Sequence, residues 1–429
     1  MAAELLHSDV MHQVGAALFA LALLHTFGAK FFEVLAHRHP RHAGLLHLLG
    51  EVEVVFGFWA FVLIGAMALL AGGDKAIAYA ESLQYTEPLF VFVVMVIAAS
   101  RPVLQTVQTV LGAVAAWVPL PRVLVSTWLG LAAVPLLGSL VTEPAAMTVA
   151  ALMLRPLVFR QDMPERWKYA ALGVLFVNVS IGGTLTSYAA PPVLMVAGTW
   201  SWDSAFMLQT FGWKAVLAVL LNATLLVAAL RRDLLALPAP VVDTGAAQAT
   251  ETPAPWLVRL IHLVFLAAVV VLAHHPVLFL GLFLFFLGYA QAYARHQSPL
   301  ILKEGLLVGF FLAGLVVLGG MQRWWLQPIV AGLEPTTLFF GALALTAVTD
   351  NAALTYLGSL IQGISSTSQY MLMAGAVAGG GLTVIANAPN PAGAALLRQG
   401  FANGAIGTLG LLLGALLPTA VAAAFFLLL

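Results

Sequence analysis

Long apolar runs, separated by short polar turns, occupy most of the chain. A helix needs about 20 apolar residues to cross the hydrocarbon core of a bilayer. We therefore place membrane spans at residues 13–32, 45–71, 88–100, 211–230, 256–273, 277–294, 304–320 and 402–429. Two amphipathic stretches, 101–117 and 321–332, are typical of helices that lie along the membrane interface. The pattern predicts an all-α polytopic membrane protein.

Four other apolar segments are interrupted by polar residues, glycine or proline. Residues 123–159 are too long for one crossing and are broken at TEPAA (142–146), and a later run is broken at TDNAA (349–353). Two further spans are interrupted by GGTLTSYAAPP (182–192) and by GGGLTVIANAP (379–389). Irregular backbone at membrane depth persists only where protein surrounds it or where it lines a cavity. We therefore predict two re-entrant hairpins and two broken helices.

The interrupted segments also form an internal repeat. Glu143 of the first hairpin motif aligns with Asp350 of the second, and the two glycine motifs align with each other. Interrupted spans at matching places in two halves indicate the binding site of a secondary transporter. The one long polar segment, residues 231–255, divides the chain between the two copies.

Charge sets the expected orientation, because lysine and arginine accumulate in cytoplasmic loops. If the N-terminus is outside, all of the 18 lysines and arginines except Lys75, Lys214 and Arg323 fall on the cytoplasmic side. We therefore predict a multi-pass protein of the inner cell membrane with a cytoplasmic central linker. The first hairpin then enters from the cytoplasm and the second from outside. The two repeats are predicted to be inverted, as alternating access requires.

Composition excludes several classes of protein. The chain is 62% hydrophobic and 8% charged, whereas soluble domains carry about 25% charged residues. The net charge is zero, so we expect the lipid bilayer and small inorganic ions as partners, and no nucleic acid. The absence of cysteine excludes disulfides, thiolate catalysis and cysteine-ligated metal centres. There is no HExxH or GxSxG motif, and we expect a transporter without a cofactor, not an enzyme or a channel.

The candidate chemistry lies in the four interrupted motifs. A charge at the centre of a bilayer costs at least about 2.5 kcal/mol, so an intramembrane acid is a functional candidate by default. Hard cations prefer oxygen ligands. The candidate ion-binding residues are Asp350, Asn351, Glu143, Thr142, Thr349, Thr186, Thr383 and Asn387. The candidate backbone breaks, which free carbonyl oxygens, are Gly182, Gly183, Gly379, Gly380, Gly381, Pro192 and Pro389.

These motifs contain no lysine or arginine, which favours a cation as substrate over an anion. A half-helix N-terminus can nevertheless replace a basic side chain at an anion site. Burial in general raises the pKa of a carboxyl group and a bound cation lowers it, so Na⁺ and H⁺ compete for one carboxylate. We predict that Asp350 is the principal carrier of Na⁺ and H⁺, and that Glu143 is its partner.

Simpler interpretations remain beside this one. Glu143 and Asp350 can stabilise helix N-termini without binding an ion, and the glycines can serve close helix packing. Glu51 and Glu53, in the predicted span 45–71, are better explained as interfacial or scaffold residues than as ligands. A cluster of histidines in one loop fits a solvated loop better than a pH sensor. These are His37, His39, His42 and His47.

The motifs resemble the ion transporter superfamily, which contains NhaD-type sodium/proton antiporters, arsenite permeases and dicarboxylate transporters. The shared pattern is an acid or serine followed by Asn and Thr at a hairpin tip, then GG-x-x-T with a downstream proline, and it is carried here by four short motifs. The first copy departs from it, with Glu143-Pro144 at the tip and Ala190-Pro191-Pro192 without an asparagine. The Ser-Asn-Thr tips of the dicarboxylate branch are missing.

The resemblance implies a sodium/proton antiporter that works as a homodimer with an elevator-type movement. A dicarboxylate or arsenite-type anion transporter of the same fold is the alternative. The resemblance also implies two scaffold arms and a transport unit formed by both halves of the chain. The corresponding ranges are 1–122 (scaffold), 123–230 (transport), 231–255 (linker), 256–335 (scaffold) and 336–429 (transport).

Overall fold

The computed structural model describes residues 2–236 and 253–429, and every regular element in these ranges is a helix. Six of these helices are long and apolar enough to cross a membrane, and two bent helix pairs raise that number to as many as eight. The prediction of an all-α, multi-pass chain is therefore confirmed. Residues 237–252 of the predicted linker lie outside the described ranges.

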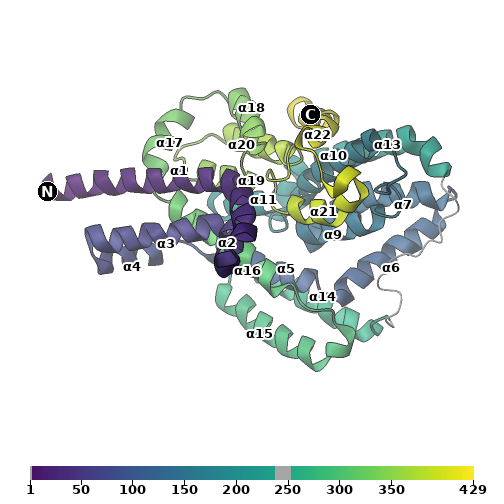
Figure 1. The fold of residues 1–429 in the computed structure, drawn as a ribbon, viewed down its shortest axis with the longest axis horizontal. Coiled ribbons are helices and arrows are strands. Elements are labelled where there is room, and N and C mark those ends of the chain that lie inside the picture. The colour runs from purple at the N-terminus through teal and green to yellow at the C-terminus, as the bar shows by residue number, and fades with distance from the viewer. Residues whose placement is uncertain (1, 237–252) are drawn as a thin grey trace.

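The N-terminal part is five helices that project in part from one end of the molecule (Figure 1). They are α1 (Ala2–Arg38), α2 (Ala43–Gly50), α3 (Val52–Ala71), α4 (Gly73–Glu81) and α5 (Thr86–Ala98). The prediction of one unbroken span over 45–71 is wrong, because extended backbone at Glu51 separates α2 from α3. The polar segment after residue 71 is also not a loop. It forms α4, which begins after Gly72 at a φ of 102° and joins α5 at a bend of 58°.

The rest of the first half contains the first hairpin and the first broken helix. Its helices are α6 (Arg101–Trp117), α7 (Arg122–Leu131), α8 (Ala133–Val141), α9 (Glu143–Leu154), α10 (Glu165–Gly182), α11 (Pro191–Trp200), α12 (Ser204–Met207) and α13 (Trp213–Leu235). Helices α7 and α8 meet at an angle of 41°. Pro135 has no N–H, so the carbonyl of Leu131 loses its helical partner. The buried Asn178 of α10 donates to that carbonyl at 2.8 Å and stabilises the bend.

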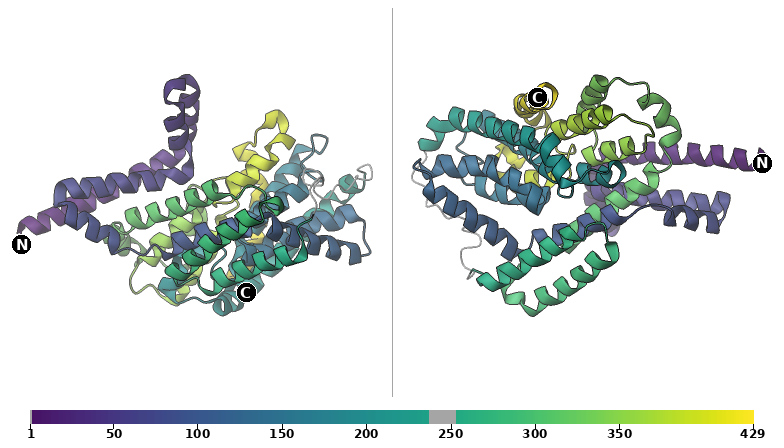
Figure 2. Two further views of the ribbon diagram at one scale, coloured as in Figure 1. Left: turned by 90° about the horizontal axis from the view of Figure 1, so that it is seen from below. Right: turned by 180° about the vertical axis from the view of Figure 1, so that it is seen from behind.

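The second half contains the second hairpin and the second broken helix. Its helices are α14 (Trp256–Val271), α15 (Pro276–Ala292), α16 (Leu302–Gly319), α17 (Arg323–Val330), α18 (Pro335–Thr346), α19 (Asn351–Ser359), α20 (Ser366–Gly379), α21 (Asn390–Leu397) and α22 (Thr408–Leu428). The last helix begins at residue 408, six residues later than predicted, because short 3₁₀ turns occupy the segment before it. Figure 2 shows α14 and α15 as a pair along one side of the molecule.

Two large apolar clusters form most of the interior, besides a small one between α18 and α20. The first contains side chains from α7 to α11, α13, α18, α20 and α22. The second contains side chains from α1, α3, α5 and α14 to α16. Side chains next to the two hairpin tips, among them Ala145 and Ala352, belong to the second cluster although most of the hairpin helices pack in the first. The hairpin tips therefore lie where the two clusters meet.

The hairpins and the broken helices are packed crosswise. The returning limb of the first hairpin, α9, packs against α21, which follows the break in the second half. The returning limb of the second hairpin, α19, packs against α11, which follows the break in the first half. Thr355 of α19 donates to the carbonyl of Pro192 at 2.9 Å, across that second contact. Each hairpin is thus held by the other half of the chain.

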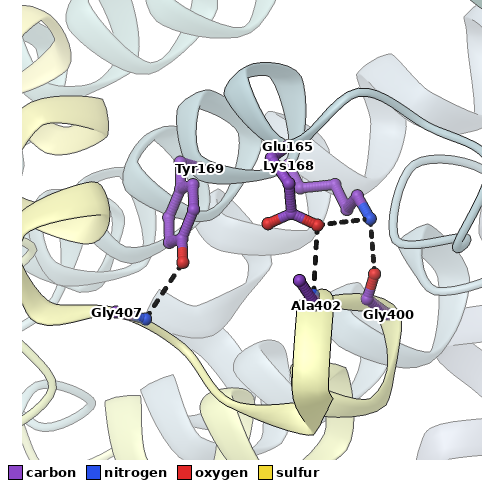
Figure 3. A network of polar contacts seen from close by, with 6 residues as sticks. All are labelled: Glu165, Lys168, Tyr169, Gly400, Ala402 and Gly407. Atoms are coloured by element: carbon purple, nitrogen blue, oxygen red, sulfur yellow. Dashed lines mark hydrogen bonds and ion pairs between the residues drawn. The ribbon is translucent and has the colours of Figure 1, made fainter.

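A buried lysine fixes one end of this assembly (Figure 3). Lys168 of α10 is 2% exposed, and its Nζ lies 2.8 Å from Glu165 Oε1 and donates to the carbonyl of Gly400 at 2.6 Å. Glu165 Oε1 also accepts from the backbone N–H of Ala402 at 3.2 Å. The segment between α21 and α22 is therefore fastened to the first turn of α10.

We predict that Lys168→Met lowers the thermal stability of the purified protein in detergent. The variant leaves Gly400 and Glu165 without their charged donor, and such hydrogen bonds contribute about 1.5–3 kcal/mol. The matched control is Arg166→Met, which removes the same charge from an exposed position of the same helix. Equal melting temperatures for the two variants would show that the Lys168 contacts contribute no stability.

Candidate functional site

The first hairpin turns at Thr142, between α8 and α9. Its backbone has a φ of 101° and a ψ of 149°. That region is occupied almost only by glycine, and a side chain there costs on the order of 1–3 kcal/mol. Thr142 is 2% exposed and its hydroxyl has no hydrogen-bond partner among the described residues. Strain of this kind is typical of functional sites, and here it brings the next residue into the protein interior.

That next residue, Glu143, is completely buried. Its Oε2 accepts a hydrogen bond of 2.9 Å from Nδ2 of Asn387, which lies in the break of the other half. Its Oε1 has no partner in the described part of the chain. A methyl group at Gly183 would lie 2.3 Å from Oε1, so the carboxylate occupies space that exists only because residue 183 has no side chain.

The second hairpin tip carries Asp350. Its Oδ1 accepts from the backbone N–H groups of Ala352 at 2.8 Å and Ala353 at 3.2 Å, so Asp350 is the N-cap of α19. The capping role considered from the sequence is therefore present at this position. It uses one carboxylate oxygen and leaves Oδ2 for other contacts.

Asp350 lines a cavity of about 50 Å³ between the second hairpin and the helices α1, α3 and α16. The polar residues of its wall are Asp350, Thr349, Asn387, Glu53 and Thr26. The rest of the wall is apolar and includes Phe27, Phe56 and Phe311. One water needs about 10–15 Å³ of such space. The cavity is therefore large enough for a small ion together with some of its water.

Asn387 is the link between the two acids. Its amide nitrogen donates to Glu143, and the same side chain lines the cavity beside Asp350. The two acids predicted from the sequence come from hairpins more than 200 residues apart, and both lie next to this one asparagine. The structure thus gathers Glu143, Asp350 and Asn387 at one place.

Three buried asparagines present their oxygens in the same way. Asn351 donates through Nδ2 to Ser180 at 3.4 Å, and Asn390 donates to the carbonyls of Gly380 at 2.7 Å and Thr383 at 3.0 Å. Together with Asn387, both are at most 1% exposed, and the Oδ1 atom of each lacks a partner among the described residues. In each of the three asparagines the amide nitrogen donates a hydrogen bond, and the amide oxygen accepts none from the described residues.

Asn390 is a site residue that the sequence analysis did not select. Its signal was its place in the second glycine motif, directly after Pro389. Nothing local showed that its nitrogen would satisfy the carbonyls freed by the glycines, which leaves only its oxygen available. That assignment depends on how the break folds back on itself.

The predicted threonines differ in their surroundings. Thr186 donates to the carbonyl of Ser139 at 2.7 Å, and Thr383 donates to the carbonyl of Ala347 at 2.9 Å. In each half, the threonine fastens the break to the entering limb of its own hairpin. Both hydroxyl groups donate their protons in this way. That Thr186 and Thr383 are ion ligands stays a prediction. Thr349, by contrast, lines the cavity.

Glu53 lies where the sequence analysis did not expect it. The preferred interpretation was an interfacial or scaffold position, yet Glu53 lines the cavity that also contains Asp350. Its neighbour Glu51 is instead paired with Lys303 at 2.9 Å, and both of these side chains are partly exposed. The loop histidines His39 and His42 are exposed, which fits the solvated interpretation, and the side chain of His37 lies outside what the structure describes.

The arrangement is rich in acceptors. Among the described residues, no three acidic or histidine side chains gather closely enough to hold one metal ion. A cation at this site would therefore be bound by one or two carboxylates together with neutral oxygens, which is the ligand set of a hard monovalent or divalent cation.

Comparison with known proteins assigns the chain to a family. A family model described as "Putative Na+/H+ antiporter" matches residues 10–429, a range that includes both hairpins and both breaks. A search of curated proteins finds no match. Because the family match extends over nearly the whole chain, the protein belongs to the Putative Na+/H+ antiporter family.

Proposed function

We propose that this protein exchanges Na⁺ for H⁺ across the membrane, with both ions competing for the carboxylates of Glu143, which is buried, and Asp350, which is partly buried. The observation that carries the proposal is the buried Oε1 of Glu143, which has no partner among the described residues, together with the unpartnered amide oxygen of Asn387, whose nitrogen is bound to Glu143. The family assignment supports cation and proton exchange.

The cost of leaving buried oxygens without partners favours a site that always holds either a proton or a cation. A buried polar atom without a partner costs about 1–3 kcal/mol, and a charged one costs more. Glu143 Oε1 and the Oδ1 atoms of Asn351, Asn387 and Asn390 all require a donor or a cation. A proton on Glu143 turns one acceptor into a donor, while a cation satisfies several oxygens at once. The two loaded forms exclude each other, and this exclusion is the chemical basis of exchange.

An anion substrate of the dicarboxylate or arsenite type fits the site less well. The cavity wall contains two acids and no lysine or arginine. The N-terminus of α19 is a place where an anion could bind, but the carboxylate of Asp350 already occupies it. The electrostatics of the cavity therefore favour a cation.

Movement is proposed to follow the elevator scheme. In that scheme two inverted repeats, each with a hairpin and a broken helix, would form a transport unit that slides against scaffold arms in a homodimer. The crosswise packing of α9 on α21 and of α19 on α11 supports a unit that moves as one body. The position of the hairpin tips between two apolar clusters supports a sliding surface at that place.

Asp350→Asn is expected to reduce Na⁺-driven H⁺ flux to the level of protein-free vesicles. Asparagine caps a helix about as well as aspartate, so the variant keeps the fold of the tip and loses only the charge. The measurement is dequenching of a pH-sensitive dye in proteoliposomes after addition of Na⁺. The matched control is Asp203→Asn, because Asp203 caps α12 through a bond of 2.7 Å to Phe206 and does not line the cavity. Flux in Asp350→Asn equal to the control would remove Asp350 from the mechanism.

Glu143→Gln is expected to fold normally and to lose its response to Na⁺. Glutamine resembles the protonated acid, since its oxygen can accept from Asn387 and its amide can donate to a neighbouring oxygen. A ligand that binds the native state raises the melting temperature, so wild-type protein should melt higher in Na⁺ than in choline at equal ionic strength. The variant should show no such difference, and the exposed Glu334→Gln should behave as wild type. A normal Na⁺ response in Glu143→Gln would contradict a role in binding.

Gly183→Ala is expected to weaken Na⁺ binding about tenfold or more, which corresponds to about 1.4 kcal/mol. The added methyl group would lie 2.3 Å from Oε1 of Glu143 and must displace it. Gly281→Ala in α15 is the control, because nothing lies within 4 Å of a methyl group there. The half-saturating Na⁺ concentration for H⁺ flux measures the effect. An unchanged value would show that the carboxylate position beside Gly183 is not needed for ion binding.

A further inference from the structure

The cavity beside Asp350 contains a second acid, and that acid comes from outside the hairpins and broken helices. Glu53 lies in the first turn of α3, whereas Asp350, Thr349 and Asn387 belong to the second half of the chain. The mechanism proposed above makes no use of Glu53. Its position is therefore a feature that the exchange at Glu143 and Asp350 does not explain.

Close packing of α3 on α16 determines where Glu53 lies. A methyl group at Gly314 would be 2.3 Å from the backbone nitrogen of Gly57, so the two helices touch through these glycines. Residues 53 and 57 are one turn apart and share a face of α3. Phe56 of α3 and Phe311 of α16 both line the cavity, with ring centroids 5.3 Å apart. The contact thus turns the first turn of α3 toward the cavity.

The charges near Glu53 leave it available for a cation. Lys303, the basic residue of this region, has its ion pair with Glu51 at 2.9 Å. Within the described residues Glu53 has no ion pair of its own, and the cavity wall offers no basic side chain. The N-terminus of α3 stabilises a negative charge in its first turn. Two carboxylates on one small cavity repel each other, and either a cation between them or a proton on one of them relieves the repulsion.

A further atom on the wall also requires a donor or a cation. Asn387 is 1% exposed, lines the cavity and has an Oδ1 without a partner among the described residues, while its nitrogen is bound to Glu143. Thr26 donates its hydroxyl proton to the carbonyl of Ala22 at 3.0 Å, so only its oxygen is open to the cavity. A volume of about 50 Å³ holds roughly four waters at about 10–15 Å³ each. The walls suit a partly hydrated cation better than a bare one.

We propose that this cavity is the cation-binding vestibule of the exchange site, in which Glu53, Asn387 and Asp350 hold a hydrated monovalent cation on its path to Glu143. This inference rests on the proposed exchange of Na⁺ for H⁺ and adds Glu53 to the residues that contact the ion. Glu53 and Asp350 face the vestibule, and Asn387 separates it from the buried Glu143. An ion therefore passes from a wet site with two acids to a drier site with one.

The natural absence of cysteine allows a direct test of binding. A cysteine introduced by Thr26→Cys lies on the cavity wall and can be labelled with a small, water-soluble thiol reagent in the full-length protein. Na⁺, with choline as the reference cation, should slow the labelling because the ion occupies the cavity. Val348→Cys, on the same wall, is a second reporter if Thr26→Cys does not fold.

Adding Glu53→Gln to the reporter should raise the Na⁺ concentration for half-maximal protection about tenfold or more, the change that corresponds to about 1.4 kcal/mol. Adding Glu51→Gln instead should leave it unchanged, since Glu51 is two residues away and does not line the cavity. Equal protection with Glu53→Gln and Glu51→Gln, or no protection by Na⁺ with either reporter, would overturn the vestibule.

Transport measurements separate this inference from the proposed function. In proteoliposomes Glu53→Gln should raise the KM for Na⁺ and largely keep the maximal H⁺ flux, whereas Asp350→Asn abolishes that flux. If wild-type vesicles show no Na⁺-driven H⁺ flux, the exchange proposal fails, and the labelling experiment still decides whether Glu53 binds a cation. If exchange is present and Glu53→Gln has a wild-type KM and wild-type protection, only the vestibule is wrong.

Discussion

The hydrogen bond from Asn387 to Glu143 is the contact on which the candidate site depends. It joins two residues 244 positions apart in the sequence, one from a hairpin tip and one from a helix break of the other half, and both are buried. A carboxylate in this position needs a donor, because water is excluded and an isolated charge is costly. The bond also fixes the amide of Asn387 so that its oxygen is left over beside the cavity.

Other side chains near this bond also use their donors and leave their oxygens free. The nitrogen of Asn390 and the hydroxyls of Thr186 and Thr383 hold the irregular backbone, and the oxygens of the buried asparagines are left without donors among the described residues. Proline has no N–H and glycine disfavours the helical conformation, so carbonyls at the breaks lose their helical partners, and side-chain donors replace some of those hydrogen bonds. The amide nitrogens of the three buried asparagines are all used as donors, so what these side chains leave over is a set of oxygens. Side chains that replace the missing hydrogen bonds of a broken helix in this way also leave oxygens of the kind that bind a hard cation.

Much of the fold could be predicted because its signals are local. The length of each apolar run identifies a span, and an acid, a glycine pair or a proline inside such a run identifies an interruption. Glu143 and Asp350 were found in this way, since each is an acid inside an apolar run. Errors arose where the local pattern was ambiguous. The apolar run over 45–71 continues past Glu51, yet the helix ends there, and the short polar segment after it is helical.

The sequence by itself determined that the protein is a helical membrane protein with four interrupted motifs, because hydrophobic length and helix-breaking residues act over a few neighbours. Only the tertiary structure decided which of those residues meet. Asn387 reaches Glu143, Asn390 turns its nitrogen to the freed carbonyls, and Glu53 arrives at the cavity because glycines let α3 approach α16 closely. The contacts of Asn387 and Glu53 depend on packing between segments hundreds of residues apart, and that of Asn390 depends on how one break folds back on itself, so no local pattern contains that information.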